Sequence, residues 1–236
     1  MLDRIRTKII LTYIFHRYSG FESERQYWQW VLSDSTQQRE NLRFDPQIRS
    51  MIFPYDLFTY LPEKARILEI GSGPVSDLAW GVEKGIITVI AVDPLADEYA
   101  KILNALGKDY PIRPIKRNTE QIDRDLGLFD AVYMRNSLDH TENPKRVLFR
   151  ASKLLKQDGI LYIAGNINEG SKNHWLGLHQ YNLIIEDNRL VAYTKKRHKL
   201  DLLKNLPFKP IFCNTQINGR KGLMTIIFRK QHSKKK

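Results

Sequence analysis

The chain has 236 residues, a formal net charge of +12 at pH 7 and one cysteine, Cys213. A single cysteine excludes a disulfide framework or a cysteine metal site within the chain and suits a reducing cytosol, and no apolar run reaches the roughly 18 residues that span a membrane. The length allows one α/β domain, expected over residues 63–230, with a segment over 1–62 before it and a basic tail over 231–236.

The first segment, residues 1–62, is rich in aromatic and basic side chains and is expected to be helical. Apolar side chains recur at steps of three and four residues, at Leu2, Ile5, Ile9 and Tyr13. Basic residues lie between them, at Arg4, Arg6 and Lys8, so the pattern predicts an amphipathic helix. Such a helix packs on the core or a second subunit, which is the commoner use, or else it binds a membrane surface or a ligand. Residues 24–32 and 45–61 predict further helices that close over a ligand site.

The most informative segment follows, where a predicted strand over residues 65–70 runs into a glycine pair. Gly71 and Gly73 allow the backbone to come close to a ligand, and a helix is expected to begin there. A second parallel strand is expected over residues 86–92. Asp93, at its end, falls where a carboxylate accepts hydrogen bonds from both hydroxyls of a ribose. These residues predict a nucleoside-binding crevice at the carboxyl ends of two strands.

The chemistry of this loop distinguishes between nucleosides. A dinucleotide fingerprint has a third glycine three positions after the second, where this chain has Ser76. Pro74 has no N–H to offer a pyrophosphate, and Glu69 repels phosphate and suits a cationic ligand. S-adenosylmethionine has an ammonium, a sulfonium and a ribose but no phosphate. An acidic residue before Gly-x-Gly resembles the first motif of the class I S-adenosylmethionine-dependent methyltransferases, and this interpretation is favoured over a nicotinamide dehydrogenase.

The resemblance extends over about residues 64–166 and implies a fold. It places a third strand at 112–115, a fourth at 129–134, a helix beginning at Asn143-Pro144 and a fifth strand at 160–164. The implied architecture is an α/β, doubly wound, mostly parallel sheet of seven strands, the Rossmann-like methyltransferase fold.

The chain departs from this pattern after the fifth strand. Residues 181–186 and 189–193 flank the turn pair Asp187-Asn188, which predicts a hairpin inserted at about 166–194 beside the crevice. The helix that the family has next is expected at 195–203. The last two strands are expected at 210–216 and 223–229, joined by Asn218-Gly219.

The resemblance also implies which residues hold the cofactor S-adenosylmethionine. They are Glu69, Gly71, Ser72, Gly73, Asp93, Pro94, Asn118, Thr119 and Asn136. Asn118 stands where the family often has an acidic residue that lines the adenine, so its amide oxygen would accept from the adenine without charge.

Three histidines are candidates for the general base that an oxygen acceptor needs. His140 comes first, with His179 and His174 behind it, and Trp175 is a candidate to stack on a sugar ring or a base. Each histidine also has a purely structural interpretation. His174 and His179 lie five residues apart, one too many for a shared helical face, so no metal site is predicted.

The acceptor is the least determined part of the prediction. The segments 92–99 and 177–181 resemble those of bacterial methyltransferases of surface-polysaccharide pathways, which implies O-methylation of a carbohydrate or a similar polar acceptor. Such an enzyme is expected in the cytoplasm or at the inner membrane surface, and an oligomer stays open. Basic clusters at 195–199 and 234–236 suit an anionic membrane or RNA instead. The alternatives are an RNA or small-metabolite methyltransferase, or a non-catalytic cofactor-binding partner, for which Val75 in place of a third glycine is the one sign.

Overall fold

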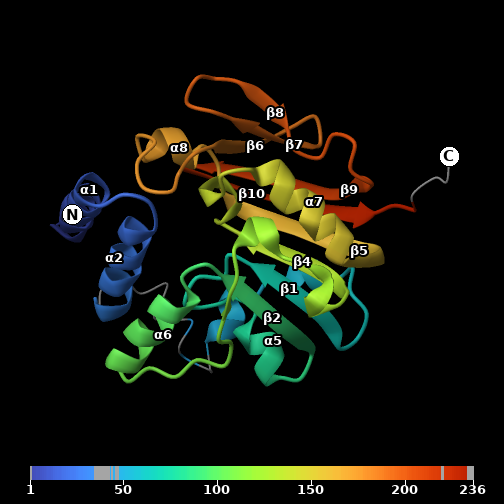
Figure 1. The fold of residues 1–236 in the computed structure, drawn as a ribbon, viewed down its shortest axis with the longest axis horizontal. Coiled ribbons are helices and arrows are strands. Elements are labelled where there is room, and N and C mark those ends of the chain that lie inside the picture. Colours follow the sequence, from blue (N-terminus) through green and yellow to red (C-terminus); the bar gives the residue numbers. More distant parts are fainter. Residues whose placement is uncertain (1, 35–42, 44, 46–47, 219–220, 233–236) are drawn as a thin grey trace.

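A computed structural model describes residues 2–34, 43, 45, 48–218 and 221–232. At its centre is a seven-stranded sheet with the order β3-β2-β1-β4-β5-β10-β9 (Figure 1). The strands are β1 (Ala65–Ile70), β2 (Ile87–Asp93), β3 (Ile115–Lys116), β4 (Phe129–Arg135), β5 (Leu155–Asn166), β9 (Phe208–Asn218) and β10 (Lys221–Lys230). Strands β1 to β5 pair in parallel, and β10 is antiparallel to both of its neighbours. The predicted doubly wound, mostly parallel α/β fold is confirmed.

The central strands are almost continuously apolar because both faces of the sheet are covered. Ile67 and Leu68 of β1 and Val132 of β4 are fully buried. The strand order reverses between β1 and β4, and in open α/β sheets the ligand crevice lies at this point, beyond the carboxyl ends of the strands.

One face of the sheet is covered by a helix and a small second sheet. The helix is α7 (Pro144–Leu154), and the small antiparallel sheet consists of β6 (Asn182–Glu186), β7 (Arg189–Tyr193) and β8 (Lys199–Asp201). Asn143 caps α7, since its side chain accepts from the N–H of Arg146 at 3.1 Å. Leu148 of α7 and Leu190 of β7 share a buried cluster with the sheet, so the small sheet is part of the core.

The opposite face is covered by helices from the first half of the chain. They are η1 (Arg49–Ile52), α4 (Tyr55–Phe58), α5 (Ala79–Glu83) and α6 (Ala96–Ala105). Leu57 and Tyr99 are buried against the sheet with Leu32, which comes from α2 (Gly20–Ser33). The remaining short helices of the described residues are η2 (Thr119–Gln121), η3 (Arg124–Leu126), η4 (Leu138–His140) and α8 (Glu169–Lys172).

The prediction of a helix at residues 195–203 is wrong. The chain forms a turn there, with Arg197 at φ 61°, and then β8, which pairs with β7. Leu200 and Leu202 lie two residues apart and pack against the same core, which is the period of a strand. Consecutive basic residues at 195–199 are left exposed on the turn. The predicted hairpin is therefore a three-stranded sheet that stands where the family helix was expected.

Smaller differences concern strand ends. The third strand is Ile115–Lys116 and not residues 112–115, because Pro114 has no N–H for the ladder. The turn at Asn218-Gly219 cannot be compared, since Gly219 lies outside the described residues, as does the lysine tail at 234–236.

The N-terminal segment forms α1 (Leu2–Arg17) and α2, which lie at one edge of the molecule (Figure 1). The predicted helix is present, but its predicted apolar side is not packed on the core at Ile9 and Tyr13, which are 63% and 60% exposed, whereas Ile14 is buried. The side chains of Leu2 and Ile5 lie outside the described residues. No helix among the described residues combines the length and the apolar character needed to cross a bilayer.

Candidate active site

A cavity of about 410 Å³ opens at the carboxyl ends of β1, β2 and β4. Every residue predicted to hold the cofactor lines it, and so do His140 and His179. His174 is exposed and is not among the lining residues. The sheet brings these side chains together because its parallel strands end at the same edge.

The loop after β1 requires glycine. Gly71 has φ 70°, and a Cβ there would lie 2.4 Å from the Cβ of Ser137, whose hydroxyl donates to the carbonyl of Ile70 at 2.9 Å. Gly73 has φ 63° and lies against the ring of Trp28. The helix expected directly after the glycines begins only at Ala79, so a loop and not the start of a helix lines the crevice there.

Two buried carboxylates stand at neighbouring strand ends. Asp93 Oδ2 accepts from the N–H of Gly73 at 3.0 Å, and Oδ1 accepts from the N–H of Leu95 at 2.9 Å. Burial raises the pKa of Asp93 to about 6 despite these two bonds. Burial also raises the pKa of Glu69 to about 7, against a hydrogen bond with Ser76 and the charge of Arg43. Glu69 Oε2 is buried without a hydrogen-bond partner in the described structure, which fits a cationic ligand.

The two predicted asparagines have local roles as well. Asn118 Oδ1 accepts from the N–H of Glu120 at 2.9 Å and so caps η2, which begins at Thr119. Asn136 adopts φ 48°, and its Oδ1 accepts from the N–H of Asn166 at 2.8 Å. This bond ties the end of β4 to the end of β5.

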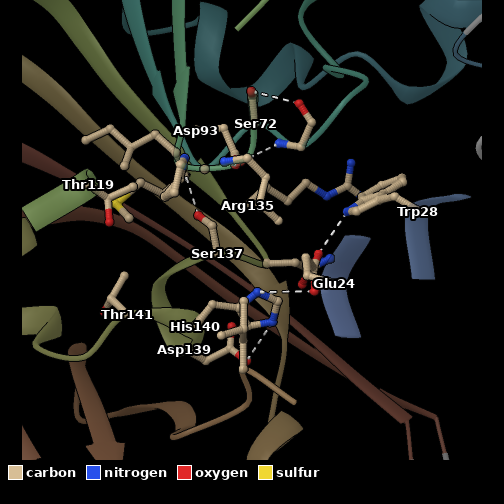
Figure 2. Close-up of a pocket in the computed structure, with 18 of the residues that line it drawn as sticks. Glu24, Trp28, Ser72, Asp93, Thr119, Arg135, Ser137, Asp139, His140 and Thr141 are labelled. Carbon is tan, nitrogen blue, oxygen red and sulfur yellow. Dashed lines mark hydrogen bonds and ion pairs between the residues drawn. The ribbon is translucent and has the colours of Figure 1, made fainter. Parts of the chain in front are cut away.

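Helix α2 contributes side chains to the cavity wall that the glycine motif does not reveal. Trp28 Nε1 donates to Glu24 Oε1 at 2.8 Å (Figure 2). The indole also packs edge-on against Tyr99. Both Glu24 and Trp28 line the cavity. The prediction that residues 24–32 form a helix over the site agrees with this placement.

A buried ion cluster beside the glycine loop was not predicted. Asp77 is paired with Arg43, whose Nε lies 2.9 Å from Oδ1, and with Arg135, and the hydroxyl of Tyr133 donates to Asp77 Oδ2 at 3.4 Å. The two guanidiniums come from segments 92 residues apart in sequence, so no local pattern could have signalled the cluster.

The histidine cluster forms where η4 meets the loop after α8. Nδ1 of His179 lies 2.8 Å from Oδ2 of the buried Asp139 and 3.1 Å from Nε2 of His140. Figure 2 shows His140 between Asp139 and Glu24, whose Oε2 is 4.0 Å from Nδ1. Burial opposes the charged forms of Asp139 and His179, yet the positive charge of His140 and the hydrogen bond with His179 lower the pKa of Asp139, and the bond with Asp139 raises the pKa of His179. The three residues are near enough to share a metal ion, but 2.8 Å is a hydrogen-bond length that one proton explains.

The other two candidates from this segment, His174 and Trp175, are not among the residues that line the cavity. Trp175, expected to stack on the acceptor, has φ 61°, and its ring packs against Gly170 of α8, where a Cβ would come within 2.7 Å of it. Asp139 was missed, although its position beside His140 was the signal that could have found it.

Comparison with known proteins agrees with this geometry. A family model described as "Methyltransferase domain" matches residues 49–200. No curated protein sequence matches the chain. Among solved structures, N-methyltransferase NodS from Bradyrhizobium japonicum, in complex with S-adenosylhomocysteine, is similar with a TM-score of 0.54 and 13% identity, over 88% of this chain and 98% of that one. An S-adenosylmethionine-dependent methyltransferase from Clostridium acetobutylicum has a TM-score of 0.51 and 13% identity, over 80% of this chain and 93% of that one.

The family match covers more than half of the chain, so the chain belongs to the methyltransferase-domain family. It is an enzyme, an S-adenosylmethionine-dependent methyltransferase. Its sheet is the predicted seven-stranded, mostly parallel sheet, with β10 antiparallel to both of its neighbours.

Proposed function

We propose that this methyltransferase transfers the methyl group to a hydroxyl of a carbohydrate or a similar polar small acceptor. The observation that carries the proposal is the hydrogen bond between His179 and the buried Asp139 at the wall of the cofactor cavity. A hydroxyl must lose its proton as it attacks, and a histidine close to neutrality is suited to accept it.

In this proposal the cofactor is held by the residues predicted from the glycine motif. Asp93 accepts from the ribose hydroxyls, and Glu69 with Oε2 unpaired in the described structure attracts the positive charge. Gly71, Ser72 and Gly73 provide close backbone approach, with Pro94 beside them. Asn118, Thr119 and Asn136 line the remaining wall.

When bound, the cofactor supplies a methyl group on a positive sulfur, and the C–S electron pair stays on that sulfur while the acceptor oxygen bonds the methyl carbon. The chain's own task is to hold the acceptor in line and to accept the hydroxyl proton. His140 and His179 both line the cavity and are proposed for this task. His174 stays a weaker candidate because it is exposed outside the wall.

The charge of the cavity supports a small acceptor over RNA. Carboxylates line it at Glu24, Glu69, Asp77, Asp93, Glu120, Asp139, Glu142 and Glu169. The cations among its described lining residues are Arg43 and Arg135, and both are paired with Asp77. A wall of this charge repels a phosphate backbone, although the chain as a whole carries +12.

The same carboxylates favour a second candidate, methylation of an amine on a small metabolite. Glu24, Asp139 and Glu169 surround the histidines and would attract a protonated amine. The histidine that accepts a hydroxyl proton would serve equally for the ammonium proton.

The lone cysteine supports a cytoplasmic enzyme, and the exposed face of α1 supports contact with an anionic membrane surface. Ile9 and Tyr13 are exposed on that face, and Arg6 and Arg17 are exposed on the same helix. Sedimentation with anionic vesicles that is lost in Ile9→Ser/Tyr13→Ser would support this contact, and unchanged sedimentation would refute it.

The test of the acceptor is transfer of labelled methyl from S-adenosylmethionine into fractionated cell material. Polysaccharide with its lipid-linked precursors, RNA and small metabolites are separated before counting. Label in the carbohydrate fraction, lost in Asp93→Ala, supports the proposal. Label among small amines supports the second candidate, and label in RNA contradicts both.

A further inference from the structure

We propose that Asp139 is a positioning residue: it fixes the His179 ring with the proton on Nδ1, so that Nε2 of His179 is the atom that accepts the acceptor's proton. The inference rests on the proposed function and deepens it, since it selects one of the three histidines and assigns its tautomer. It also gives a role to a buried carboxylate that the sequence motifs did not single out.

The first step is the position of the proton between Asp139 and His179. Asp139 Oδ2 and His179 Nδ1 are 2.8 Å apart, which is a hydrogen-bond length, and an ionised carboxylate can only accept. Nδ1 of His179 must therefore carry the hydrogen. A neutral imidazole protonated on Nδ1 has its lone pair on Nε2, which makes Nε2 the basic atom of the ring.

The second step concerns His140, the first candidate from the sequence. Its Nε2 lies 3.1 Å from the same Nδ1 of His179 and 3.6 Å from Asp139 Oδ2. Because that Nδ1 already bears a hydrogen, Nε2 of His140 accepts a share of it and points its lone pair at His179. The proton of His140 is then on Nδ1, the atom that faces Glu24 at 4.0 Å. In this arrangement His140 supports the pair and does not accept from the acceptor.

The third step is the rigidity of the pair. Asp139 and His179 are 40 residues apart, and their loops are joined by a backbone bond from the N–H of Gln180 to the carbonyl of Asp139 at 3.0 Å. Leu138 beside them is buried in the core. Among the described residues, the charged and titratable groups that face His179 include Asp139 and His140 from η4, Glu24 from α2 and Glu169 from α8. Asp139 is the one of these carboxylates that bonds the ring directly.

The experiment is nitrogen NMR of the histidine side chains in the full chain with bound S-adenosylhomocysteine, read from pH 5 to 9. His140→Gln and His179→Gln assign the signals. We expect His179 as the Nδ1–H tautomer with a pKa above that of an ordinary histidine. Asp139→Asn should lower that pKa by about one unit or more, because the amide has no charge to stabilise the imidazolium. Asp187→Asn, an exposed change in the β6–β7 turn, is the matched control and should leave it unchanged.

Three results would overturn the proposal: an Nε2–H tautomer of His179, a His179 pKa that Asp139→Asn does not move, or signals that change when a chelator removes a bound ion. With an acceptor identified, Asp139→Asn should lower kcat about a hundredfold or more with little change in cofactor Kd. Failure of the proposed function is recognised separately, since the labelled methyl would then be found outside the carbohydrate fraction while the tautomer and the pKa of His179 could still be read.

Discussion

At the scale of single residues, the proposed cofactor site contains two buried carboxylates, Asp93 and Glu69, that differ in their hydrogen bonds. Asp93 is held in place by two backbone amides, whereas Glu69 keeps one oxygen without a hydrogen-bond partner in the described structure. Both are raised in pKa by burial, so both resist ionisation until a cation or a donor arrives. The two residues can be tested independently.

Asp93→Ala should weaken binding of S-adenosylmethionine by about 2 kcal/mol, roughly 30-fold, because two ribose hydrogen bonds are lost. Isothermal titration calorimetry measures the change. Asp97→Ala is the control, since Asp97 is an exposed acid on α6 paired with Lys116. Equal affinity of Asp93→Ala and the parent chain would remove Asp93 from the cofactor site.

Cofactor affinity should also increase as the pH rises from 6 to 8. Below a pKa of about 7 Glu69 is protonated and cannot attract a sulfonium or ammonium, and above it the carboxylate is charged. Asp93, whose pKa is about 6, also gains its negative charge as the pH rises and so contributes to the same increase in affinity. Calorimetry across this range should give a falling Kd for the parent chain and a flatter profile for Glu69→Gln. A profile that keeps its slope in Glu69→Gln would assign the titration to another group.

At the scale of elements, the loop after β1 is shaped by the approach of the loop after β4. Gly71→Ala should destabilise the chain by more than about 2 kcal/mol, since its Cβ would meet Ser137 and its φ is positive. Gly85→Ala is the control for the effect of positive φ alone, because Gly85 has φ 65° and open space around it. It should lower the free energy of unfolding by about 1 kcal/mol. Urea unfolding of the two variants gives the comparison. Equal losses would show that the contact with Ser137 relaxes.

Helix α2 acts as a wall of the site through one face. Trp28→Ala should weaken cofactor binding about tenfold or more, because the indole packs on Gly73 and holds Glu24 by a hydrogen bond. Trp30→Ala is the matched control on the same helix, since Trp30 bonds Asp34 and does not line the cavity. Calorimetry should separate the two variants. If both lose affinity equally, α2 acts only through its folding.

At the scale of the whole molecule, the cavity and the surface differ in sign of charge. The chain carries +12, while carboxylates outnumber cations among the described lining residues of the cavity. We expect an excess of RNA to leave S-adenosylmethionine binding and methyl transfer unchanged, because RNA bound by surface lysines would not enter the acidic cavity. Transfer should also vary little between low and moderate salt, whereas RNA binding falls steeply. If RNA at low salt inhibited methyl transfer or cofactor binding, RNA would again be a candidate acceptor.

Much of the fold could be predicted because its signals are local. The buried strand before Gly71, the apolar run before Asp93 and the start of a helix at Asn143-Pro144 can each be recognised within a few residues. Residues 195–203 were predicted wrongly because their identity as a strand depends on pairing with β7 and on burial of Leu202. Strand propensity of so short a segment is decided by its neighbours.

The class of fold, the chemistry of the cofactor and the residues around the glycine loop could be predicted from short segments, because strand periodicity, glycine geometry and charge are properties of such segments. Three contacts became visible in the folded chain alone: His179 with Asp139, Asp77 with both Arg43 and Arg135, and Glu24 of α2 with His140. Each of these contacts joins distant segments through the packing of the sheet and its covering layers. The physical reason is that a hydrogen bond or ion pair needs proximity within a few ångströms, and only the folded core specifies which distant side chains come that close.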